Sequence, residues 1–378
     1  MSPPGPRVLL LCKGLGLGGA ERLVCAQVAG RAGGPAAVRY EVAYVRPDKD
    51  ALVGELRAAG APVHHLAAAR GGWPRALAAL LREVRPDVVH SHSPLVAAVA
   101  RVLVALGCAG RGARHVYTEH NRWDAYRAPT RRVNQATMAV DTRVWAVSED
   151  ARRSVRPAAL RRRVQTLTHG IDTRRVATHR LDAEQRADAR RRLGLPIDAV
   201  VATNIANLRP EKDHAGLLAA FDRAADRVPA LHLVAVGVGL DTDPGVVGAA
   251  GRSPHADRLH LLGFRPDALD VLAASDLLVL GSRHEGLPVA VMEALALGIP
   301  VVATAVGGIP ELLGRSEAAL LVPPRDPGRL AGALVALATD PAHRARAGHA
   351  AAALAGEVDA ARAVAEVEAA YREVAGRG

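Results

Sequence analysis

The sequence contains few cysteines, few aromatic residues and no long apolar run, and each shortage excludes a class of protein. Its three cysteines, Cys12, Cys25 and Cys108, are odd in number and far apart, so they suggest neither a disulfide framework nor a metal site. Aromatic residues make up 3% of the 378 residues and do not interleave with basic ones, which argues against a nucleic-acid partner. No apolar run approaches the ~20 residues of a membrane span, and the N-terminus lacks the pattern of a signal peptide. We therefore expect a cytoplasmic protein, at most peripheral at the inner face of a membrane.

Lysine is also scarce, and the positive charge is concentrated in one span. Only Lys13, Lys49 and Lys212 occur among the 49 lysines and arginines, so a lysine inside a motif is informative. The net charge is +11, and residues 121–192 contain 18 arginines against 8 acidic residues. Three interpretations remain open: solvated helix faces, contact with an anionic membrane, or an anionic substrate. Sedimentation with lipid vesicles at low and high salt separates the membrane interpretation from the others.

Short apolar runs alternate with longer amphipathic ones, and this alternation is repeated after a break. Strands are expected at 7–12, 40–45, 62–66, 87–91, 115–119, 143–147 and 164–168, with helices between them such as 20–28, 73–84 and 95–106. Residues 172–192 are charge-rich and poorly patterned. Further strands follow at 200–206, 231–236, 259–262, 277–280, 300–303 and 319–322, with helices at 214–225, 268–274, 289–297 and 327–338. Continuous apolar strands separated by helices indicate parallel sheets covered on both faces.

The predicted fold is α/β, with two Rossmann-like doubly wound domains that face each other across a cleft. The expected limits are 1–175 for the N-terminal domain and 176–357 for the C-terminal domain. A long amphipathic helix, within 358–378, is expected to pack back across the N-terminal domain. Because open parallel sheets bind ligands outside the carboxyl ends of their strands, site residues are expected in the loops that follow strands.

The first such loop resembles a dinucleotide-binding fingerprint. Gly14, Gly16 and Gly19 satisfy G-x-G-x-x-G between a predicted strand and a predicted helix. That fingerprint also requires an acidic residue at the end of the second strand, to bind ribose. The second predicted strand ends in Val-Arg-Pro, and its only carboxylate, Glu41, lies near its start. An NAD-dependent oxidoreductase is therefore kept as an alternative only.

A pair of glutamates in the second half points to sugar and phosphate chemistry. Glu285 and Glu293 stand in a Glu-x7-Glu spacing, and Gly-Leu-Pro separates the first from a predicted helix. The N-terminus of such a helix favours an anion such as phosphate, and a carboxylate one turn inside it can accept hydrogen bonds from sugar hydroxyls. The alternative is one glutamate that caps the helix and one that faces solvent.

The loop Ala-Asn-Leu-Arg-Pro-Glu-Lys-Asp-His follows another predicted strand and contains two basic side chains. Arg209 and Lys212 could clamp a diphosphate, with the guanidinium as a fork and the ammonium as a point charge. The alternative is an exposed basic turn whose helix is capped by Asp213.

These two segments, together with THGID (168–172), YTEHN (117–121) and GLGGAERLV (16–24), resemble one family over essentially the whole chain. The ensemble is similar to the retaining glycosyltransferases of family 4, the group 1 glycosyltransferases, which have the GT-B fold. The resemblance implies that Arg209 and Lys212 neutralise the diphosphate of a nucleotide-sugar donor. It also implies that Glu293 holds the ribose hydroxyls and that Glu285 contacts hydroxyls of the transferred sugar.

The resemblance assigns roles to backbone groups and to the N-terminal domain as well. The N–H groups of Gly286 and Leu287 would bind the distal phosphate and sugar, and Gly263 and Phe264 would border the nucleobase. In the N-terminal domain, the family match singles out three residues: His120 would reach the sugar near the reacting carbon, and Gly18 and Gly19 would face the donor phosphate and the acceptor.

Two further features of the sequence stay outside these assignments. His90 and His92, in VHSHSP, either border the acceptor or pack inside the domain. Asp241 and Asp243 form the Asp-x-Asp that binds a metal in other glycosyltransferases, but they lie in a Gly/Pro-bounded loop and are interpreted as loop residues.

The resulting hypothesis is a metal-independent retaining glycosyltransferase without a bound cofactor. It would move a hexosyl-type group from a nucleoside diphosphate sugar, by default UDP and otherwise GDP, to a hydroxyl acceptor that is lipid-linked or a small natural product. A sugar-nucleotide epimerase is the first alternative, because it shares the architecture. It would be recognised by turnover of the donor without any acceptor. The NAD-dependent oxidoreductase is the second.

Overall fold

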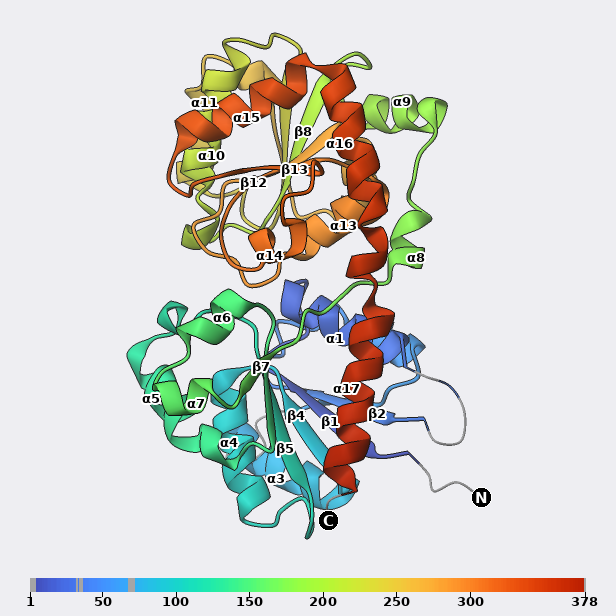
Figure 1. The fold of residues 1–378 in the computed structure, drawn as a ribbon, viewed down its shortest axis with the longest axis vertical. Helices are drawn as coiled ribbons and strands as arrows, with labels where there is room; N and C mark the ends of the chain where they lie inside the picture. The colour runs from blue at the N-terminus through green and yellow to red at the C-terminus, as the bar shows by residue number, and fades with distance from the viewer. Residues whose placement is uncertain (1–4, 32, 34–36, 67–71, 377–378) are drawn as a thin grey trace. The chain divides into compact units, whose positions relative to one another are not determined.

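The computed structural model describes the chain except residues 1–4, 32, 34–36, 67–71 and 377–378, and it divides the chain into two compact units (Figure 1). The first unit consists of Met1–Asp172 and Asp359–Gly378, and the second of Thr173–Val358. The sequence-based limits were 175/176 and 357/358. The last helix, α17 (Ala360–Ala375), belongs to the first unit, where it contacts α1 and β4.

The first unit is built on a seven-stranded parallel sheet with the strand order β3-β2-β1-β4-β5-β6-β7. Its strands are β1 (Arg7–Cys12), β2 (Arg39–Tyr44), β3 (Val63–His65), β4 (Val88–Ser91), β5 (Arg114–Glu119), β6 (Arg143–Ala146) and β7 (Val164–Thr166). Besides α17, its helices are α1 (Gly19–Ala29), α2 (Val53–Ala58), α3 (Gly72–Val84), α4 (Pro94–Ala105), α5 (Ala128–Thr137), α6 (Glu149–Ser154) and α7 (Ala158–Arg161), with 3₁₀ turns at Trp123–Ala125 and Met138–Val140. The strand order reverses between β1 and β4, and such reversals mark ligand sites in open α/β sheets.

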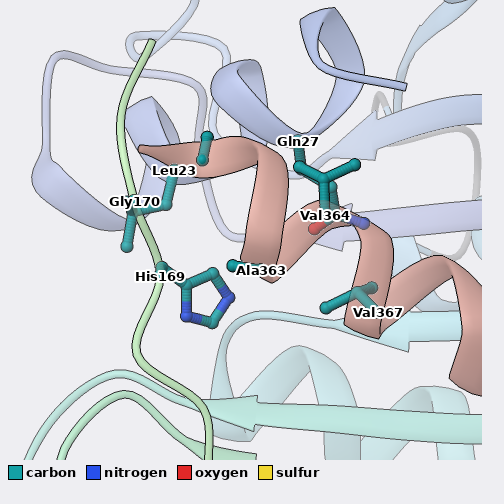
Figure 2. Close-up of a pocket in the computed structure, with 8 residues that line it drawn as sticks. Leu23, Gln27, His169, Gly170, Ala363, Val364 and Val367 are labelled. Atoms are coloured by element: carbon teal, nitrogen blue, oxygen red, sulfur yellow. The ribbon is translucent and has the colours of Figure 1, made fainter. Parts of the chain in front are cut away.

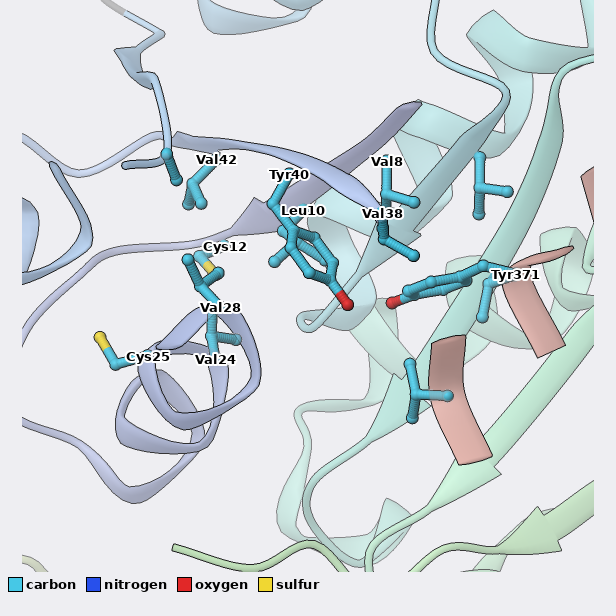
Figure 3. Close-up of a cluster of buried hydrophobic side chains, with 14 of the residues drawn as sticks. Val8, Leu10, Cys12, Val24, Cys25, Val28, Val38, Tyr40, Val42 and Tyr371 are labelled. Carbon is cyan, nitrogen blue, oxygen red and sulfur yellow. The ribbon is translucent and has the colours of Figure 1, made fainter. Parts of the chain in front are cut away.

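The central strand β1 shows why this sequence makes a sheet that is covered on both faces. Leu9, Leu10 and Leu11 are all fully buried. Leu10 packs into a core with α1 and α17, to which Tyr40 and Tyr371 contribute their rings (Figure 3). Its neighbours Leu9 and Leu11 pack into a second core with α3 and α4 on the opposite face. A strand buried on both faces needs a continuous apolar run, which is the pattern seen in the sequence.

The second unit has a six-stranded parallel sheet with the order β10-β9-β8-β11-β12-β13. Its strands are β8 (Val200–Ile205), β9 (Leu231–Val236), β10 (Leu259–Gly263), β11 (Leu277–Leu280), β12 (Val301–Thr304) and β13 (Ala319–Val322). Its helices are α8 (Thr173–Ala177), α9 (Ala183–Arg192), α10 (His214–Ala225), α11 (Pro244–Gly251), α12 (Ala268–Ala273), α13 (Val289–Leu297), α14 (Ile309–Leu313), α15 (Pro327–Thr339) and α16 (Pro341–Ala353), with 3₁₀ turns at Pro210–Lys212, Ala256–Arg258 and Ala355–Val358. The predicted pair of Rossmann-like parallel sheets is confirmed, and every expected strand is present with ends that differ by at most two residues.

The charge-rich stretch 172–192 differs from its prediction, because it contains two helices, α8 and α9. Asp182 and Gln185 form a capping box at the start of α9. Arg186 and Arg190 then bind the carboxylate of Asp276, with N···O distances of 2.9 and 2.7 Å. Arginines rather than an apolar stripe hold α9 in place, so the helix has no hydrophobic period that the sequence could reveal.

None of the helices in the described part of the chain combines the length and the hydropathy that a membrane crossing requires.

Candidate functional site

In the second unit, Lys212 and Glu285 meet at the carboxyl edge of the sheet. Lys212 lies in the loop after β8 and Glu285 in the loop after β11, and these two strands are neighbours. The Lys212 ammonium donates to both carboxylate oxygens of Glu285, at 2.8 and 2.7 Å, and the Ser282 hydroxyl donates to the same carboxylate at 2.7 Å. The Glu285 side chain is 6% exposed and that of Lys212 is 21% exposed. Lys212 is predicted to bind the diphosphate of a donor, and Glu285 the hydroxyls of its sugar. In the free protein the two side chains are held as an ion pair that is partly shielded from water.

The turn that contains Glu285 and Gly286 is clamped by the loop after β12. Gly307 has a φ of +59°, and a Cβ there would lie 2.2 Å from the carbonyl oxygen of Glu285, so only glycine fits. The N–H of Gly308 donates to the carbonyl of Gly286 at 2.7 Å. Leu287 is buried. This support holds the start of α13 in one geometry, as a site for a phosphate at a helix N-terminus needs.

The helix α13 follows without a capping side chain at its first position. Pro288 occupies the N-cap position, and its side chain makes no capping hydrogen bond. The backbone N–H groups at the helix start therefore have no side-chain acceptor from the N-cap. Glu293 lies half-buried within α13.

The loop before α10 is tied to the loop that carries Glu285. Arg283 donates through its backbone N–H to the carbonyl of Glu211 and through its guanidinium to Asp213, both at 2.7 Å. Asp213 has a φ of +51° and does not cap α10 with its side chain, so the simple capped-turn alternative does not describe this loop. Arg209 is exposed, with Glu211 at 3.8 Å. The contact of Arg209 with Glu211 is long and exposed to solvent, whereas the pair of Lys212 with Glu285 is short and partly buried.

Gly263 and Phe264, which are expected to border a base, lie beside the Asp-x-Asp in the second unit. Gly263 ends β10 with a φ of +63°, and a Cβ there would meet the carboxylate of Asp241 at 2.3 Å. Phe264 is 51% exposed, so its ring is accessible for stacking. Asp243 caps α11 by accepting the N–H of Val246 at 3.0 Å. Asp243 therefore caps a helix, and no group of three histidine, cysteine or acidic side chains suited to a metal occurs among the described residues.

In the first unit, His120 belongs to a row of buried imidazoles that follow strand ends. His92 follows β4, His120 follows β5 and His169 follows β7. His92 Nδ1 and His120 Nε2 are 3.0 Å apart, and the rings of His120 and His169 are 6.0 Å apart between centroids. Burial lowers the pKa of His92 and His120 well below the ordinary value and lowers that of His169 to about 4. The row is therefore neutral at neutral pH and can exchange hydrogen bonds with hydroxyl groups.

His90 is a packing residue, as one of the two interpretations had it. It is fully buried, and its ring nitrogens pair with the hydroxyls of Tyr371 (2.5 Å) and Thr118 (2.8 Å). Its ring also lies against His92, with 4.2 Å between centroids, so it supports the imidazole row from the core side.

The glycine loop of the first unit makes room for a lysine stem. A Cβ on Gly14 would lie 2.7 Å from the Cβ of Lys49, and Gly16 also borders this side chain. Gly18 is the N-cap of α1 and Gly19 its first residue. Glu41, the only carboxylate of β2, is occupied by Arg7 and His64. Two of the fingerprint glycines therefore serve local packing, and the acidic ribose ligand of a dinucleotide site is missing.

Comparison with known protein families matches both halves of the chain. A model described as "Glycosyltransferase Family 4" matches residues 8–175, and one described as "Glycosyl transferases group 1" matches residues 199–340. The chain belongs to the group 1 glycosyltransferases. The predicted family resemblance is thereby confirmed.

Curated proteins with similar sequences match this chain over part of their length. A D-inositol 3-phosphate glycosyltransferase of Streptomyces avermitilis is 34% identical over 229 residues, which are 58% of this chain and 48% of the relative. The putative teichuronic acid biosynthesis glycosyltransferase TuaC of Bacillus subtilis is 30% identical over 264 residues, 67% of this chain and 61% of TuaC. The chain thus spans about half the length of the first of these relatives.

Solved structures of low sequence identity share the fold. Anabaena HepE, solved in complex with UDP and glucose, superposes with a TM-score of 0.82 at 19% identity, covering 97% of this chain and 98% of HepE. A sucrose-phosphate synthase from Thermosynechococcus elongatus superposes with a TM-score of 0.76 at 18% identity, covering 99% of this chain and all of the other. The two Rossmann-like units are therefore those of the GT-B fold.

One buried carboxyl beside the imidazole row was missed by the sequence analysis. Glu119 is the last residue of β5 and accepts hydrogen bonds from Tyr117 at 3.0 Å, from the N–H of Asn121 at 3.3 Å, and from Tyr126. Burial raises its pKa from 4.5 to about 7, against the lowering effect of these hydrogen bonds. A glutamate at the end of an apolar strand, directly before the predicted site residue His120, was the available signal.

The protonation of Glu119 makes the stability of the first unit depend on pH. Its folded pKa lies above the unfolded value, so the native state binds more protons between pH 4.5 and 7, and the Glu119 contribution to the free energy of unfolding falls as pH rises through that window. For this rise in the pKa of Glu119, the free energy of unfolding falls by about 3 kcal/mol over the whole window. Glu119→Gln is therefore expected to gain stability relative to the parent from pH 5 to 7, with no further gain above pH 8, as measured by urea unfolding.

The difference between variant and parent isolates this effect, because the buried histidines act in the opposite direction in both proteins. Their folded pKa is lowered, so their contribution is lost as pH falls below about 6.5. Glu149→Gln, at a partly exposed carboxyl whose pKa is lowered to about 2, is the matched control and should show no gain in this window. A constant difference between Glu119→Gln and the parent from pH 5 to 8 would contradict the assignment.

Proposed function

We propose that this chain is a metal-independent retaining glycosyltransferase that takes a hexosyl-type group from a nucleoside diphosphate sugar, with UDP as the nucleotide. The observation that carries the proposal is the Lys212–Glu285 pair beside the uncapped start of α13. Both lie where open parallel sheets bind ligands. The proposal is supported by family membership and by the neighbour HepE, which was solved with UDP-glucose.

Donor binding would rearrange the ion pair. A diphosphate beside Arg209 and Lys212 competes for the Lys212 ammonium and releases the Glu285 carboxylate, which Ser282 continues to orient. The released carboxylate then accepts hydrogen bonds from hydroxyls of the transferred sugar, while the N–H groups of Gly286 and Leu287 meet the distal phosphate. Glu293 binds the ribose. An ion pair that already exists in the free protein thus prepares both charges for separate parts of one donor.

The chemistry follows from the charge that develops on the leaving group. As the glycosidic C–O bond breaks, its electron pair goes to the diphosphate oxygen, where Arg209, Lys212 and the helix N-terminus stabilise it. The acceptor hydroxyl attacks from the same face, and its proton passes to that diphosphate oxygen. From the first unit, the proposal assigns His120 to a hydroxyl of the sugar, and Gly18 and Gly19 to the donor phosphate and the acceptor.

The acceptor in this proposal is a hydroxyl compound, small or lipid-linked. The curated relatives include proteins named for D-inositol 3-phosphate and for teichuronic acid biosynthesis, and these names support a hydroxyl acceptor without choosing between the two classes. A transfer assay distinguishes the proposal from an epimerase, because an epimerase converts the donor when no acceptor is present.

Peripheral contact with an anionic membrane is proposed for the first unit. Several arginines of the basic span are bound internally, as Arg186 and Arg190 are. Others have no ion pair among the described residues and cluster on α5 and near α7: Arg131, Arg132, Arg156, Arg161 and Arg162. The exposed apolar residues Val133 and Val140 accompany them. Vesicle sedimentation at low and high salt tests this contact, and equal binding to anionic and neutral vesicles would exclude it.

Thermal unfolding tests donor binding directly. UDP at 100 times its Kd is expected to stabilise the folded protein by about 2.7 kcal/mol, whereas NAD should have no effect. In Glu293→Ala, loss of a charged hydrogen-bond acceptor should weaken UDP binding by about 10- to 100-fold. The exposed Glu317→Ala is the control and should keep the full shift. Stabilisation by NAD but not by UDP would support the oxidoreductase alternative instead.

A further inference from the structure

A small cavity in the first unit lies among α1, α17 and the segment after β7. Its wall is mostly apolar, and two polar side chains enter it, Gln27 from α1 and His169 (Figure 2). The remaining lining residues are Leu23, Gly170, Ala360, Ala363, Val364 and Val367. Gln27 is 3% exposed and His169 is 5% exposed, so water outside the protein cannot solvate either of them.

Each of these two side chains has one buried atom without a hydrogen-bond partner in the described chain, Gln27 Oε1 and His169 Nε2. The amide nitrogen of Gln27 is committed, because it donates to the hydroxyl of Tyr371 at 2.9 Å and faces that of Tyr40 at 3.4 Å. The carbonyl oxygen Oε1 is therefore the atom that remains, and it can only accept.

His169 also presents an acceptor to the cavity. Its Nδ1 lies 3.1 Å from the carbonyl oxygen of Leu167, and since a carbonyl only accepts, Nδ1 carries the proton. The ring is neutral at neutral pH, so Nε2 has a free lone pair and no hydrogen. Two side chains that line one cavity thus each carry a buried acceptor without a partner in the described chain, and an unsatisfied group of this kind costs about 1–3 kcal/mol.

We propose that this cavity is a binding site for one water molecule, which donates one hydrogen bond to Gln27 Oε1 and the other to His169 Nε2. About 10 Å³ of the cavity is open to the centre of a water molecule, the size of a site for a single water. An ammonium group would also donate, but its charge is strongly disfavoured in an apolar wall. The inference does not rest on the proposed function.

The water joins the segment after β7, which carries His169, to α1, which carries Gln27. On one side, Gln27 belongs to a hydrogen-bonded chain that continues through Tyr371 to His90. On the other side, His169 precedes Gly170, where a Cβ would lie 2.5 Å from the backbone of Asp359. The adjacent Ile171 accepts the N–H of Ala360 at 2.9 Å. The water therefore fixes the His169 ring, whose centroid lies 6.0 Å from that of His120, to the hydrogen-bonded chain of α1 and α17.

A matched pair of substitutions at Ala363 tests the site. Ala363→Val fills the cavity with a methyl group and leaves both acceptors without a hydrogen-bond donor. Ala363→Thr places a side chain of the same shape as valine there, but its hydroxyl can donate. Thr is expected to have a folding equilibrium constant about tenfold larger than Val at this position, from denaturant midpoints. At Ala370, which is buried on the same helix but does not line the cavity, the order should be reversed, because burying a hydroxyl in place of a methyl group is unfavourable.

The pair of variants at Ala370 controls for the hydrogen bond that a threonine hydroxyl can make to a carbonyl of the preceding helical turn, because this bond is possible at both positions. A high-resolution crystal structure of the full chain provides the second measurement, and a water peak within hydrogen-bonding distance of both acceptors is expected. An empty cavity, or the same Thr-to-Val order at Ala363 and Ala370, overturns the proposal. Neither readout involves glycosyl transfer, so failure here would leave the proposed function untouched.

Discussion

Replacing Lys212 with alanine is expected to lower the rate of glycosyl transfer by about 100- to 1,000-fold, the usual effect of removing one group that stabilises transition-state charge. Lys212 is one of three lysines in the chain, and its ammonium already lies 2.7 Å from the Glu285 carboxylate. In the proposed reaction it is transferred to the diphosphate, whose charge grows as the sugar leaves. The binding of UDP should weaken less than kcat falls, because the product charge is shared with Arg209.

The experiment compares kcat and the UDP Kd for Lys212→Ala, Lys212→Arg and Arg192→Ala. The arginine variant keeps the positive charge and should retain more activity than alanine. Arg192 is exposed in the same unit without a described ion pair, so its removal controls for the lost net charge. Loss of Lys212 also leaves Glu285 without its cation, and the unfolding midpoint must therefore be recorded for each variant. Turnover in folded Lys212→Ala within a factor of about three of the parent would refute the assignment.

Replacing Arg101 with leucine is expected to lower the free energy of unfolding of the first unit by about 3–5 kcal/mol. Arg101 lies on α4, is fully buried and binds both oxygens of Asp141, at 2.8 and 2.7 Å. It also donates to the side chain of Asn134 at 2.7 Å, and its guanidinium lies 4.8 Å from the ring centroid of Tyr117. Leucine would leave the buried carboxylate of Asp141 without its cation, which is the costly half of a broken buried pair.

Arg143→Leu is the matched control, because Arg143 pairs with Glu373 at 2.8 Å on a partly exposed surface of the same unit. Such pairs contribute about 0–1 kcal/mol, so this variant should unfold close to the parent. The double variant Arg101→Leu/Asp141→Asn should recover part of the loss. Urea unfolding followed by circular dichroism measures all three, and equal costs for Arg101→Leu and Arg143→Leu would contradict the buried-pair account.

Asp141 is also the third member of an arrangement that mimics a hydrolase triad. The Ser91 hydroxyl lies 2.9 Å from His115 Nε2, and His115 Nδ1 lies 2.6 Å from Asp141. All three side chains are buried, with exposed fractions of 1% or less, and Asp141 is neutralised by Arg101. A nucleophile needs access to substrate, so this network has a structural role, as the Arg101 prediction assumes.

The strands of the fold were predictable because each depends on a local pattern. The continuous run at Leu9–Leu11 predicts a strand buried on both faces, and both faces of β1 are indeed covered. The helix α9 was not predictable, because Arg190 holds it through Asp276, 86 residues away. Arg101 gave a local signal, a lone charge in an apolar helix, but its partner could not be inferred.

By itself, the sequence determined which segments form the strands and the amphipathic helices between them, that two parallel sheets result, and which candidate site residues follow strand ends. Apolar period, turn residues and motif spacing are local properties, so they can be read along the chain. Only the tertiary structure decided which of those side chains meet. Lys212 and Glu285 are 73 residues apart and pair because β8 and β11 are neighbours in the sheet. Tyr371 reaches His90 across 281 residues because α17 packs against β4. Strand order and helix docking are set by the burial of whole faces, and no local pattern of residues encodes them.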